Sequence, residues 1–442
     1  MTKTPTPSVR RGLAPGDALE LRVEKGVYRG LGLARHQGQV VFIPRALPGD
    51  LLRARIESAR GGYVEGVALA LLEGGSDRRP SPCPYVPRCG GCAYQELAYS
   101  GQLALKRGIL EESLQRAGAP WEGEIALEPS PEEGWRTRAS LHLGVEGGRL
   151  ALGLRGEGTR EVVDLPRCLQ LSEAMNRAAR GLKGALEGRS DLWRKVKGID
   201  LAESPSGDAL VAAVDTDLDT RAAASLAFLA EGAPGLSGLG VITGGRHRHF
   251  LSLRGSPYIR AEVLGVPMRA HVRSFFQGNR FLLEPLARTV VDLVPPGGPV
   301  LDLYAGVGLF ALPLAARGEA VVAMELGPSA AEDAAANARR ARFDRVRVVK
   351  CDVREGLRSW PRQGGERIVL DPPRTGAGPG VVAAIVQRRP QAVVYVSCDP
   401  PTLGRDLAAF ARAGYRADRL VAFDLFPDTF HLETVVRLVP AS

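Results

Sequence analysis

The sequence contains no long apolar run. None of its windows approaches the roughly 20 uninterrupted apolar residues that a membrane-spanning helix needs. Residues 1–15 are polar and rich in proline, and they lack the apolar core of a secretory signal, so we expect a frayed tail there. These absences predict a protein that has no membrane partner and stays in the cytoplasm.

Cysteine is scarce. Six cysteines in a chain of 442 residues do not make the dense disulfide framework of small secreted proteins. The thiols therefore point to metal binding or to catalysis.

Negative charge is in deficit, because 49 acidic residues face 58 lysines and arginines and the net charge is +9. An excess of positive charge favours a polyanionic partner, since the phosphates that it neutralises release counterions. Lysine is rare beside arginine, which reflects either genome composition or the use of guanidinium groups on phosphates and bases. A nucleic acid partner is compatible with both explanations.

Several domains are expected, because 442 residues exceed what one hydrophobic core usually serves. Short apolar runs broken by glycine indicate a small barrel of about five strands, and mixed strand-like and helical runs follow it. From residue 271 onward strands and helices alternate as in a parallel doubly wound sheet, and the last two strands are expected to pair antiparallel. The predicted fold is α/β, with a β-barrel at 10–74, a central α+β domain at 75–265 and a doubly wound Rossmann-like domain at 266–442.

A glycine-rich loop, 304–308, follows the first strand of the C-terminal domain. Glycines let a ligand approach the backbone, but this loop also fits a dinucleotide site. Glu325 ends the second strand, where a carboxylate can accept ribose hydroxyls, and Asp352 follows the third, where an adenine amino group could lie. The fourth strand ends in Asp371-Pro372-Pro373-Arg374, which resembles methyltransferases that act on a planar base. This loop favours S-adenosylmethionine over NAD.

Cys398 closes the fifth strand, at the edge where open α/β sheets bind ligands. A cysteine that ends an apolar strand is more often an inert core residue, and we interpret Cys351 in that way. Cys398 differs, because Asp371 and the glycine loop are expected to converge on its crevice. The helix that begins near Thr402 is expected to lower its pKa below about 8.5 and to make it a nucleophile.

Five segments of the C-terminal half resemble, in this order, the RNA 5-methyluridine methyltransferase family: SFFQGN, DLYAGVG, DPPR, VSCDPPTLGRDL and FPDTFHLETV. The N-terminal segment GLGLARHQGQVVFIPRALPGD resembles the TRAM domain, an RNA-binding module. Basic residues accompany the predicted barrel, namely Arg10, Arg11, Lys25, Arg29, Arg35, Arg53, Arg55 and Arg60. The resemblance thus spans nearly the whole chain.

The resemblance implies methyl transfer from S-adenosylmethionine to carbon 5 of a uracil in RNA. That carbon is a weak nucleophile, so a thiolate first adds to carbon 6, and a base later removes the carbon 5 proton. Cys398 is the implied nucleophile and Glu433 the implied base; His431 is an alternative base, and Glu433 is otherwise a plain strand-end residue. The expected cofactor contacts are Gln277, Tyr304, Gly306, Glu325, Asp352 and Asp371. Leu309 and Asp399 depart from some members, which carry a polar residue and asparagine there, but neither change removes a catalytic group.

The remaining cysteines, Cys83, Cys89, Cys92 and Cys168, are spaced like ligands of one metal centre. Members of the family that carry a four-iron four-sulfur cluster use the same pattern. Zinc and unligated thiols are the alternatives. Because Cys168 completes the ligand set, a radical S-adenosylmethionine enzyme is not expected, and the cluster would be structural.

The sequence leaves the RNA open. A cluster together with a TRAM-like domain resembles bacterial enzymes that act on 23S ribosomal RNA, and transfer RNA is the alternative. Cytosine-5 methylation fits less well, because Ser397 stands where those enzymes usually carry proline before the cysteine. A noncatalytic RNA-binding protein would not need the complete set of site residues. The oligomeric state is not fixed by the sequence, and we expect a monomer.

Overall fold

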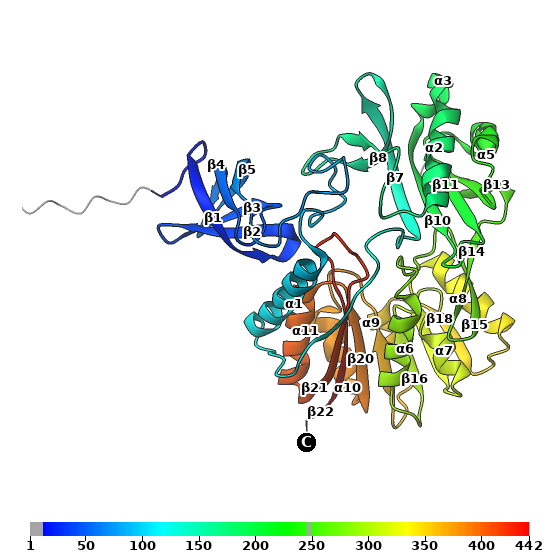
Figure 1. The fold of residues 1–442 in the computed structure, drawn as a ribbon. Coiled ribbons are helices and arrows are strands. Elements are labelled where there is room, and N and C mark those ends of the chain that lie inside the picture. The colour runs from blue at the N-terminus through cyan, green and yellow to red at the C-terminus, as the bar shows by residue number, and fades with distance from the viewer. Residues whose placement is uncertain (1–11, 245–248, 442) are drawn as a thin grey trace, which may run out of the picture. The chain divides into compact units, whose positions relative to one another are not determined.

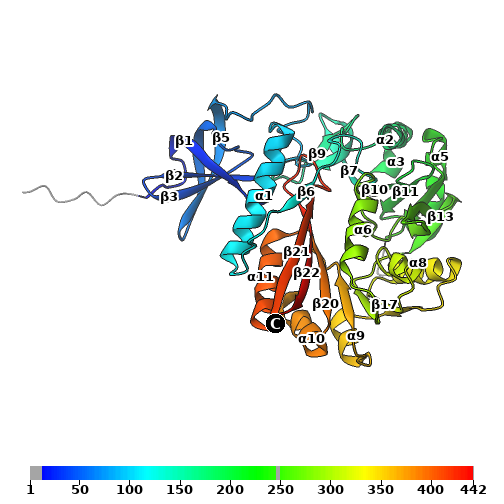
Figure 2. The ribbon, with the colours of Figure 1, turned by 60° about the horizontal axis from the view of Figure 1, so that its bottom comes forward.

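The structure is a computed structural model that describes residues 12–244 and 249–441 (Figures 1 and 2). Arg10 and Arg11, which were expected beside the barrel, lie outside the described residues. The described chain divides into two compact units. The barrel unit comprises residues 12–82, 92–109 and 428–430, and the large unit comprises 83–91, 110–244, 249–427 and 431–441.

Five strands close into a barrel in the order β1-β2-β3-β5-β4, which confirms the predicted barrel. Side chains alternate between solvent and interior, and residues such as Val41, Ile43 and Val64 fill the centre. A short 3-10 turn, η1 (Tyr28–Gly30), joins the first two strands. The strands are β1 (Ala18–Val27), β2 (Leu31–His36), β3 (Gln39–Pro44), β4 (Leu51–Arg60) and β5 (Tyr63–Glu73).

A buried carboxylate fastens the segment that leaves the barrel. Asp50 is fully buried and pairs with Arg78 at 2.8 Å, and Arg78 also pairs with Glu96 at 2.8 Å. Helix α1 (Tyr99–Arg116) follows; its residues up to Ile109 belong to the barrel unit and the rest to the large unit.

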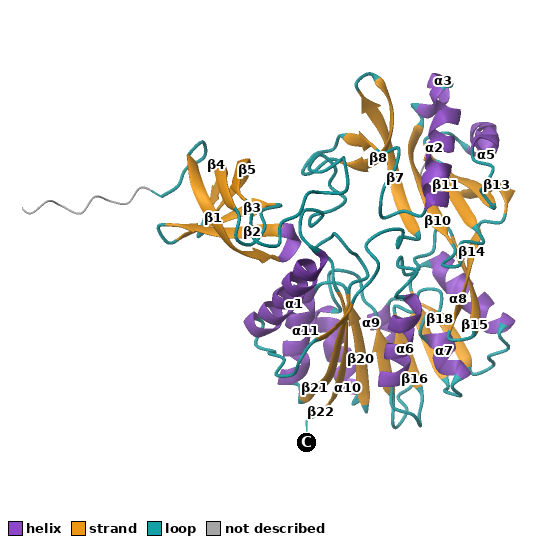
Figure 3. Ribbon diagram, in the orientation of Figure 1, coloured by secondary structure: helices purple, strands orange, loops and turns teal. Residues whose placement is uncertain are grey.

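The large unit contains a seven-stranded sheet in the order β13-β12-β11-β10-β7-β8-β9, and helix α2 packs its apolar face on it (Figure 3). This mixed sheet is the expected α+β region. Its strands are β7 (Arg138–Glu146), β8 (Arg149–Arg155), β9 (Val162–Asp164), β10 (Val196–Glu203), β11 (Leu210–Thr216), β12 (Gly238–Ile242) and β13 (Phe250–Gly255). Its helices are α2 (Glu173–Glu187), α3 (Ser190–Trp193), α4 (Thr220–Ala223), η2 (Ala224–Phe228) and α5 (Leu229–Gly232).

The large unit also contains a two-stranded hairpin of β14 (Tyr258–Val263) and β15 (Val266–His271). Its second large sheet has eight strands in the order β18-β17-β16-β19-β20-β22-β21-β6. It is parallel except for β22, which runs antiparallel to β20 and β21, as predicted. Strand β6 (Ala126–Glu128) comes from far upstream and was not expected beside β21. The other strands are β16 (Val300–Leu303), β17 (Val321–Glu325), β18 (Val346–Lys350), β19 (Arg367–Leu370), β20 (Ala392–Ser397), β21 (Tyr415–Phe423) and β22 (Glu433–Pro440).

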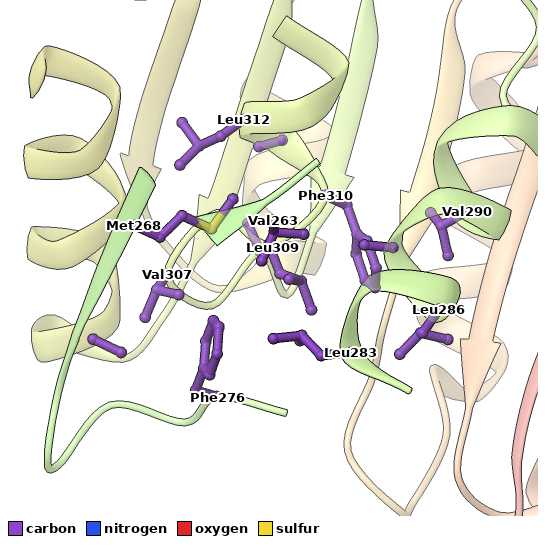
Figure 4. Packing of buried hydrophobic residues seen from close by; sticks show 14 of the residues in the cluster. Val263, Met268, Phe276, Leu283, Leu286, Val290, Val307, Leu309, Phe310 and Leu312 are labelled. Carbon is purple, nitrogen blue, oxygen red and sulfur yellow. The ribbon is translucent and has the colours of Figure 1, made fainter. Parts of the chain in front are cut away.

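Helices cover both faces of this sheet, and α11 packs beside β21 (Figure 2). They are α6 (Leu283–Leu293), α7 (Ala311–Ala316), α8 (Pro328–Arg340), α9 (Val353–Ser359), α10 (Gly378–Arg388) and α11 (Pro400–Arg412). In Figure 4, Phe276, Leu309 and Phe310 lie in one apolar cluster with residues of α6 and the β14–β15 hairpin. This packing holds the segment before α7, where the predicted glycine loop lies. None of the helices in the described ranges is long and apolar enough to cross a membrane.

Candidate active site

A cavity of about 1180 Å³ opens at the carboxyl ends of β16, β17, β19 and β20, within the large unit. Seven of the eight residues predicted as catalytic or cofactor-binding line it: Gln277, Tyr304, Gly306, Glu325, Asp371, Cys398 and Glu433. Asp352 is not among the lining residues. The parallel sheet explains the convergence, because strand ends that are distant in sequence meet at one edge.

The loop after β16 has an unusual backbone. Tyr304, Gly306 and Gly308 all have positive φ, at 60°, 56° and 94°. A tyrosine in the left-handed region is uncommon and costs about 1–3 kcal/mol, so the surrounding packing must hold it. Burial raises the pKa of the Tyr304 phenol to about 12, and the Asp352 charge adds to the rise. Tyr304 and Gly306 of this loop line the cavity.

Glu325, at the end of β17, is tied to this loop. Its carboxylate accepts the backbone N–H of Gly306 at 2.9 Å and that of Gly327 at 2.6 Å. Two donors occupy about half of the four lone-pair positions of a carboxylate. The group is therefore fixed in place and can accept further donors, such as a pair of ribose hydroxyls.

Asp302 is a buried group that was not singled out from the sequence, although it opens the DLYAGVG segment. It is fully buried in β16 and accepts the backbone N–H of Ala311 at 2.9 Å. Burial raises its pKa well above the usual range, and the nearby charges of Asp371 and Glu325 add to the rise. Its side chain fastens the start of α7 to the central strand.

Asp371 follows β19, and Gln277 faces it across the cavity. Gln277 is 4% exposed, and its Nε2 lies 3.5 Å from the Asp371 Oδ2 as a weak donor. Burial raises the pKa of Asp371 to about 7, against a small lowering by the Gln277 hydrogen bond. Among the described residues the buried Gln277 Oε1 has no hydrogen-bond partner, which leaves an acceptor for a ligand.

The loop that carries Asp371 is anchored from α11. The Asp406 Oδ2 accepts the backbone N–H groups of Ala377 and Gly378, at 2.9 and 3.2 Å. Tyr395 donates its hydroxyl to the same oxygen at 2.8 Å. This buried network holds the proline loop against the sheet, so Asp371 projects from a rigid support.

The environment of Cys398 corrects one expectation. The residue precedes α11, whose N-cap is Asp399, and we expected the helix to lower the pKa of the thiol. Instead, burial raises the pKa of Cys398 to about 12; the charges of Glu433 and Asp371 add to the rise, and Arg374 opposes it. Desolvation and two carboxylates outweigh the helix dipole, because both disfavour a thiolate.

Glu433 is the first residue of β22 and is 2% exposed. In the antiparallel pairing of β20 with β22, Ser397 lies opposite Thr434. Extending this register by one residue sets Cys398 opposite Glu433, so the two side chains share one end of the cavity. Burial raises the pKa of Glu433 well above its usual range, Asp371 adds to the rise and Arg374 opposes it. Once ionised, a carboxylate with a raised pKa is a stronger base than an ordinary one, so Glu433 must lose its proton before it can accept another.

Several cavity residues were not predicted as site residues from the sequence. Arg374 belongs to the DPPR segment, and its Nη2 lies 3.1 Å from the Nε2 of His431. Arg136, Arg138 and Arg273 also line the cavity. The DPPR motif could have identified Arg374 as a site residue. Arg136 and Arg138 lie in or just before β7, where no local sequence pattern links them to a site 130 residues or more away.

Asp352 lies between β18 and α9, as the N-cap residue of α9. Its Oδ1 accepts the backbone N–H groups of Arg354 and Glu355, at 2.9 and 3.2 Å, and so caps α9. This helix cap accounts for the aspartate in the structure. Its expected contact with adenine stays a prediction.

The four clustered cysteines are divided between the units: Cys83, Cys89 and Cys168 belong to the large unit and Cys92 to the barrel unit. The Cys89 thiol accepts the Gly91 N–H at 3.4 Å, and the Cys92 thiol lies 3.7 Å from the Gln95 Nε2. Within the described ranges, no three cysteine, histidine or acidic side chains form a group that could hold a metal ion. The four-cysteine ligand set therefore stays a prediction.

Comparison with known proteins places this geometry in a family. The family model described as tRNA (uracil-5-)-methyltransferase matches residues 98–440, and the TRAM domain model matches residues 13–69. A protein of Pseudomonas aeruginosa named 23S rRNA (uracil(1939)-C(5))-methyltransferase RlmD is 33% identical over 95% of this chain and 94% of its own length. An RNA methyltransferase of Aquifex aeolicus is 32% identical over 95% of this chain and 98% of its own length.

A solved structure shows the same architecture. The crystal structure of Pyrococcus abyssi tRNA (uracil-54, C5)-methyltransferase in complex with S-adenosyl-L-homocysteine is similar to this protein with a TM-score of 0.74 and 26% sequence identity. The match covers 95% of this chain and all of that one. The chain belongs to the tRNA (uracil-5-)-methyltransferase family and carries a TRAM domain.

Proposed function

We propose that the protein transfers a methyl group from S-adenosylmethionine to carbon 5 of a uridine in RNA, with Cys398 as nucleophile and Glu433 as base. The observation that carries this proposal is the meeting of both side chains with Asp371 and the glycine loop in one cavity. Their roles rest on the family resemblance and on the chemistry of the reaction.

The cavity residues fit the cofactor. The Glu325 carboxylate is held by two backbone N–H groups and has acceptor positions left for ribose hydroxyls. The Gln277 Oε1 is buried without a partner among the described residues, and Gly306 has no side chain that would separate a ligand from the backbone of the loop. When bound, S-adenosylmethionine supplies an electrophilic methyl group.

Cys398 would attack carbon 6 of the uracil. The sulfur forms a bond to carbon 6, and the electron pair of the carbon 5–carbon 6 double bond becomes available at carbon 5, which then accepts the methyl group. Because the thiol is protonated in the free protein at neutral pH, its proton must pass to an ionised carboxylate of the cavity, such as Asp371 with its pKa of about 7, or to solvent before the sulfur attacks.

Glu433 would complete the reaction. It takes the proton from carbon 5, the electron pair of that bond re-forms the double bond, and the sulfur leaves carbon 6 as a thiolate. Substitution of Cys398 by alanine should abolish methylation and retain binding of cofactor and RNA. Glu433→Gln should accumulate a covalent RNA adduct on a denaturing gel. Residual turnover in the first variant would refute nucleophilic catalysis, and clean turnover in the second would transfer the base role to another group, His431 first.

We propose 23S ribosomal RNA as the substrate. Relatives named for 23S rRNA in Pseudomonas aeruginosa and Pseudomonas putida are 33% identical over 95% of this chain. Transfer RNA is the second candidate, because the structural neighbour from Pyrococcus abyssi is named for it. Mapping 5-methyluridine in cellular RNA with and without the protein separates the two: loss of a ribosomal site supports the first, and loss of a transfer RNA site the second.

The four-iron four-sulfur cluster is proposed on the cysteine spacing and the resemblance alone, because the described residues do not gather its ligands. No catalytic step above depends on it. Iron, sulfide and zinc in anaerobically purified protein test it directly, with Cys89→Ser as the variant and Cys351→Ser as the matched control. Zinc without iron in the unaltered protein would overturn the cluster.

A further inference from the structure

The cavity of the large unit has a second part that the proposed reaction does not use. The carboxylates of Glu325, Asp371 and Glu433 line the part at the strand ends of the parallel sheet, whereas β7, β10 and the β14–β15 hairpin line another part and contribute Arg138 and His271. The volume of about 1180 Å³ exceeds the roughly 300–1,000 Å³ of a typical small-molecule site. There is room for more than the cofactor and one base.

Positive charge gathers in this second part. Burial lowers the pKa of His271 to about 4, and the charges of Arg273, Arg138 and Arg269 add to the lowering, so the three guanidinium groups lie around a neutral imidazole. Arg269 has an acidic neighbour, because its Nε lies 3.7 Å from Asp333. Within the described ranges, Arg138 and Arg273 form no ion pair. The two halves of the lining therefore differ in the sign of their charge.

Arg138 in particular is held in place with part of its hydrogen-bonding capacity unused. Its Nη2 donates to the carbonyl oxygen of Val272 at 2.5 Å. Its Nη1 is buried and has no hydrogen-bond partner in the part of the chain that the structure describes. Burial lowers the pKa of Arg138 to about 10, against the charge of Asp200, so the side chain is still a cation at neutral pH. A buried cation with an unused donor is costly to keep, which indicates that a ligand supplies the acceptor.

The ligand must be an anion, and the proposed partner carries many. The cofactor is a sulfonium cation, which suits the carboxylate part of the cavity, while each nucleotide of RNA adds a phosphate with several acceptor oxygens. A guanidinium group matches phosphate by donating two parallel hydrogen bonds. We propose that Arg138 binds a backbone phosphate of the RNA inside the cavity, beside the target uridine. This inference rests on the proposed function, because it takes RNA as the partner.

The test compares Arg138→Gln and Arg138→Lys with Arg412→Gln as control. Arg412 is exposed and is the last residue of α11, which starts at the cavity edge of the sheet and runs away from it, so its removal changes the net charge equally but far from the cavity. The dissociation constant of a short oligouridylate is measured over a series of salt concentrations. Cofactor affinity by calorimetry, Tm and the methylation of cellular RNA are measured on the same proteins.

We expect Arg138→Gln to weaken oligouridylate binding about tenfold to a hundredfold, the usual range for a hydrogen bond to a charged group. The slope of log Kd against log salt should fall by about 0.7, the value for one phosphate contact on a single strand. Arg138→Lys keeps the charge and should keep the slope, while it loses part of the affinity because an ammonium group lacks the planar fork. Cofactor affinity should not change, and Tm should not fall, because the glutamine replaces a buried cation that has no ion-pair partner. Arg412→Gln should leave affinity and slope near those of the unaltered protein.

Three results would overturn the phosphate contact. An unchanged salt slope in Arg138→Gln means that no phosphate is bound there, and a loss of RNA affinity that accompanies a lower Tm means that the residue is structural. Weakened cofactor binding with an unchanged salt slope assigns Arg138 to the carboxylate of the cofactor instead. Normal methylation by the unaltered protein together with any of these rejects this inference alone. Absence of methylation by the unaltered protein rejects the proposed function, whereas the salt slope still reports on the contact with RNA.

Discussion

The raised pKa of Cys398 makes a quantitative prediction about its reactivity in the free protein. With a pKa of about 12, the thiolate fraction at pH 7 is about 1 in 100,000. An unperturbed cysteine with a pKa of about 8.5 would have roughly 3% thiolate at that pH, which is about 3,000-fold more. A more basic thiolate is intrinsically more reactive toward disulfides, by about 40-fold over this pKa difference. The net expectation is reaction about 100-fold slower than that of a free thiol.

The assay is exchange with a small aromatic disulfide, followed by mass spectrometry of the peptide that contains Cys398. The rate should rise about tenfold per pH unit from about pH 7 to about pH 10 without levelling off, because the thiol stays protonated across that range. The pH dependence separates ionisation from simple shielding, which slows the reaction equally at every pH. A rate that stops rising below about pH 9 would show that the helix dipole lowers the pKa of Cys398 more than burial and the carboxylates raise it. This result would refute the raised pKa.

Three further predictions concern stability and cofactor binding. The pKa of Asp371 is about 7 in the folded state and about 3.9 in the unfolded state, so the free energy of unfolding falls by up to about 4 kcal/mol as pH rises from about 4 through 7. Asp371→Asn should remove this loss and raise Tm at pH 8 in thermal scans while it weakens cofactor binding, and an unchanged dependence of stability on pH would contradict the prediction. Glu366 pairs with Arg388 at 2.5 Å, and both side chains are buried. Glu366→Ala should lower the free energy of unfolding by about 3–5 kcal/mol in denaturant titrations, because the charge of Arg388 then stays buried without its partner. Arg437→Ala, which removes the more exposed ion pair with Asp418, should have a smaller effect. Gly308→Ala should weaken cofactor binding about tenfold by calorimetry, because its φ of 94° strains any other residue by about 1–3 kcal/mol and an added Cβ would lie 3.0 Å from Leu312; unaltered affinity would show that the loop can relax.

The type of sheet and the position of the cavity could be predicted because they depend on local pattern. The alternation of strand and helix from residue 271 onward, with polar residues at strand ends, predicts that Glu325, Asp371 and Cys398 meet at one edge of a parallel sheet, and they do. The barrel followed in the same way from short apolar runs broken by glycine. Both inferences use rules that hold for whole classes of fold.

What could not be predicted depends on contacts between distant segments. The pairing of β6 with β21 joins residues about 300 positions apart, and three residues are too few to carry a periodic pattern. The sign of the Cys398 pKa shift was wrong for the same reason: the helix after it is visible in the sequence, but the depth of burial and the approach of Glu433 from β22 are not. Asp428 likewise accepts hydrogen bonds from Gln95 and Gln102, and no sequence motif connects these glutamines to it.

The division of the barrel unit into three sequence segments affects the order in which the protein can mature during synthesis. Gln95 and Gln102 precede Asp428 by 333 and 326 residues, so their partner is made long after the barrel strands have left the ribosome. At about 5–20 residues per second, the interval is roughly 16 to 65 seconds. During that time the Gln102 amide can still donate to the carbonyl oxygens of Tyr94 and Leu97, whereas a chain that stops short of residue 428 lacks the carboxylate that accepts from both glutamines. The barrel unit is therefore complete only once residues 428–430 have been translated, which is before β22 has been made.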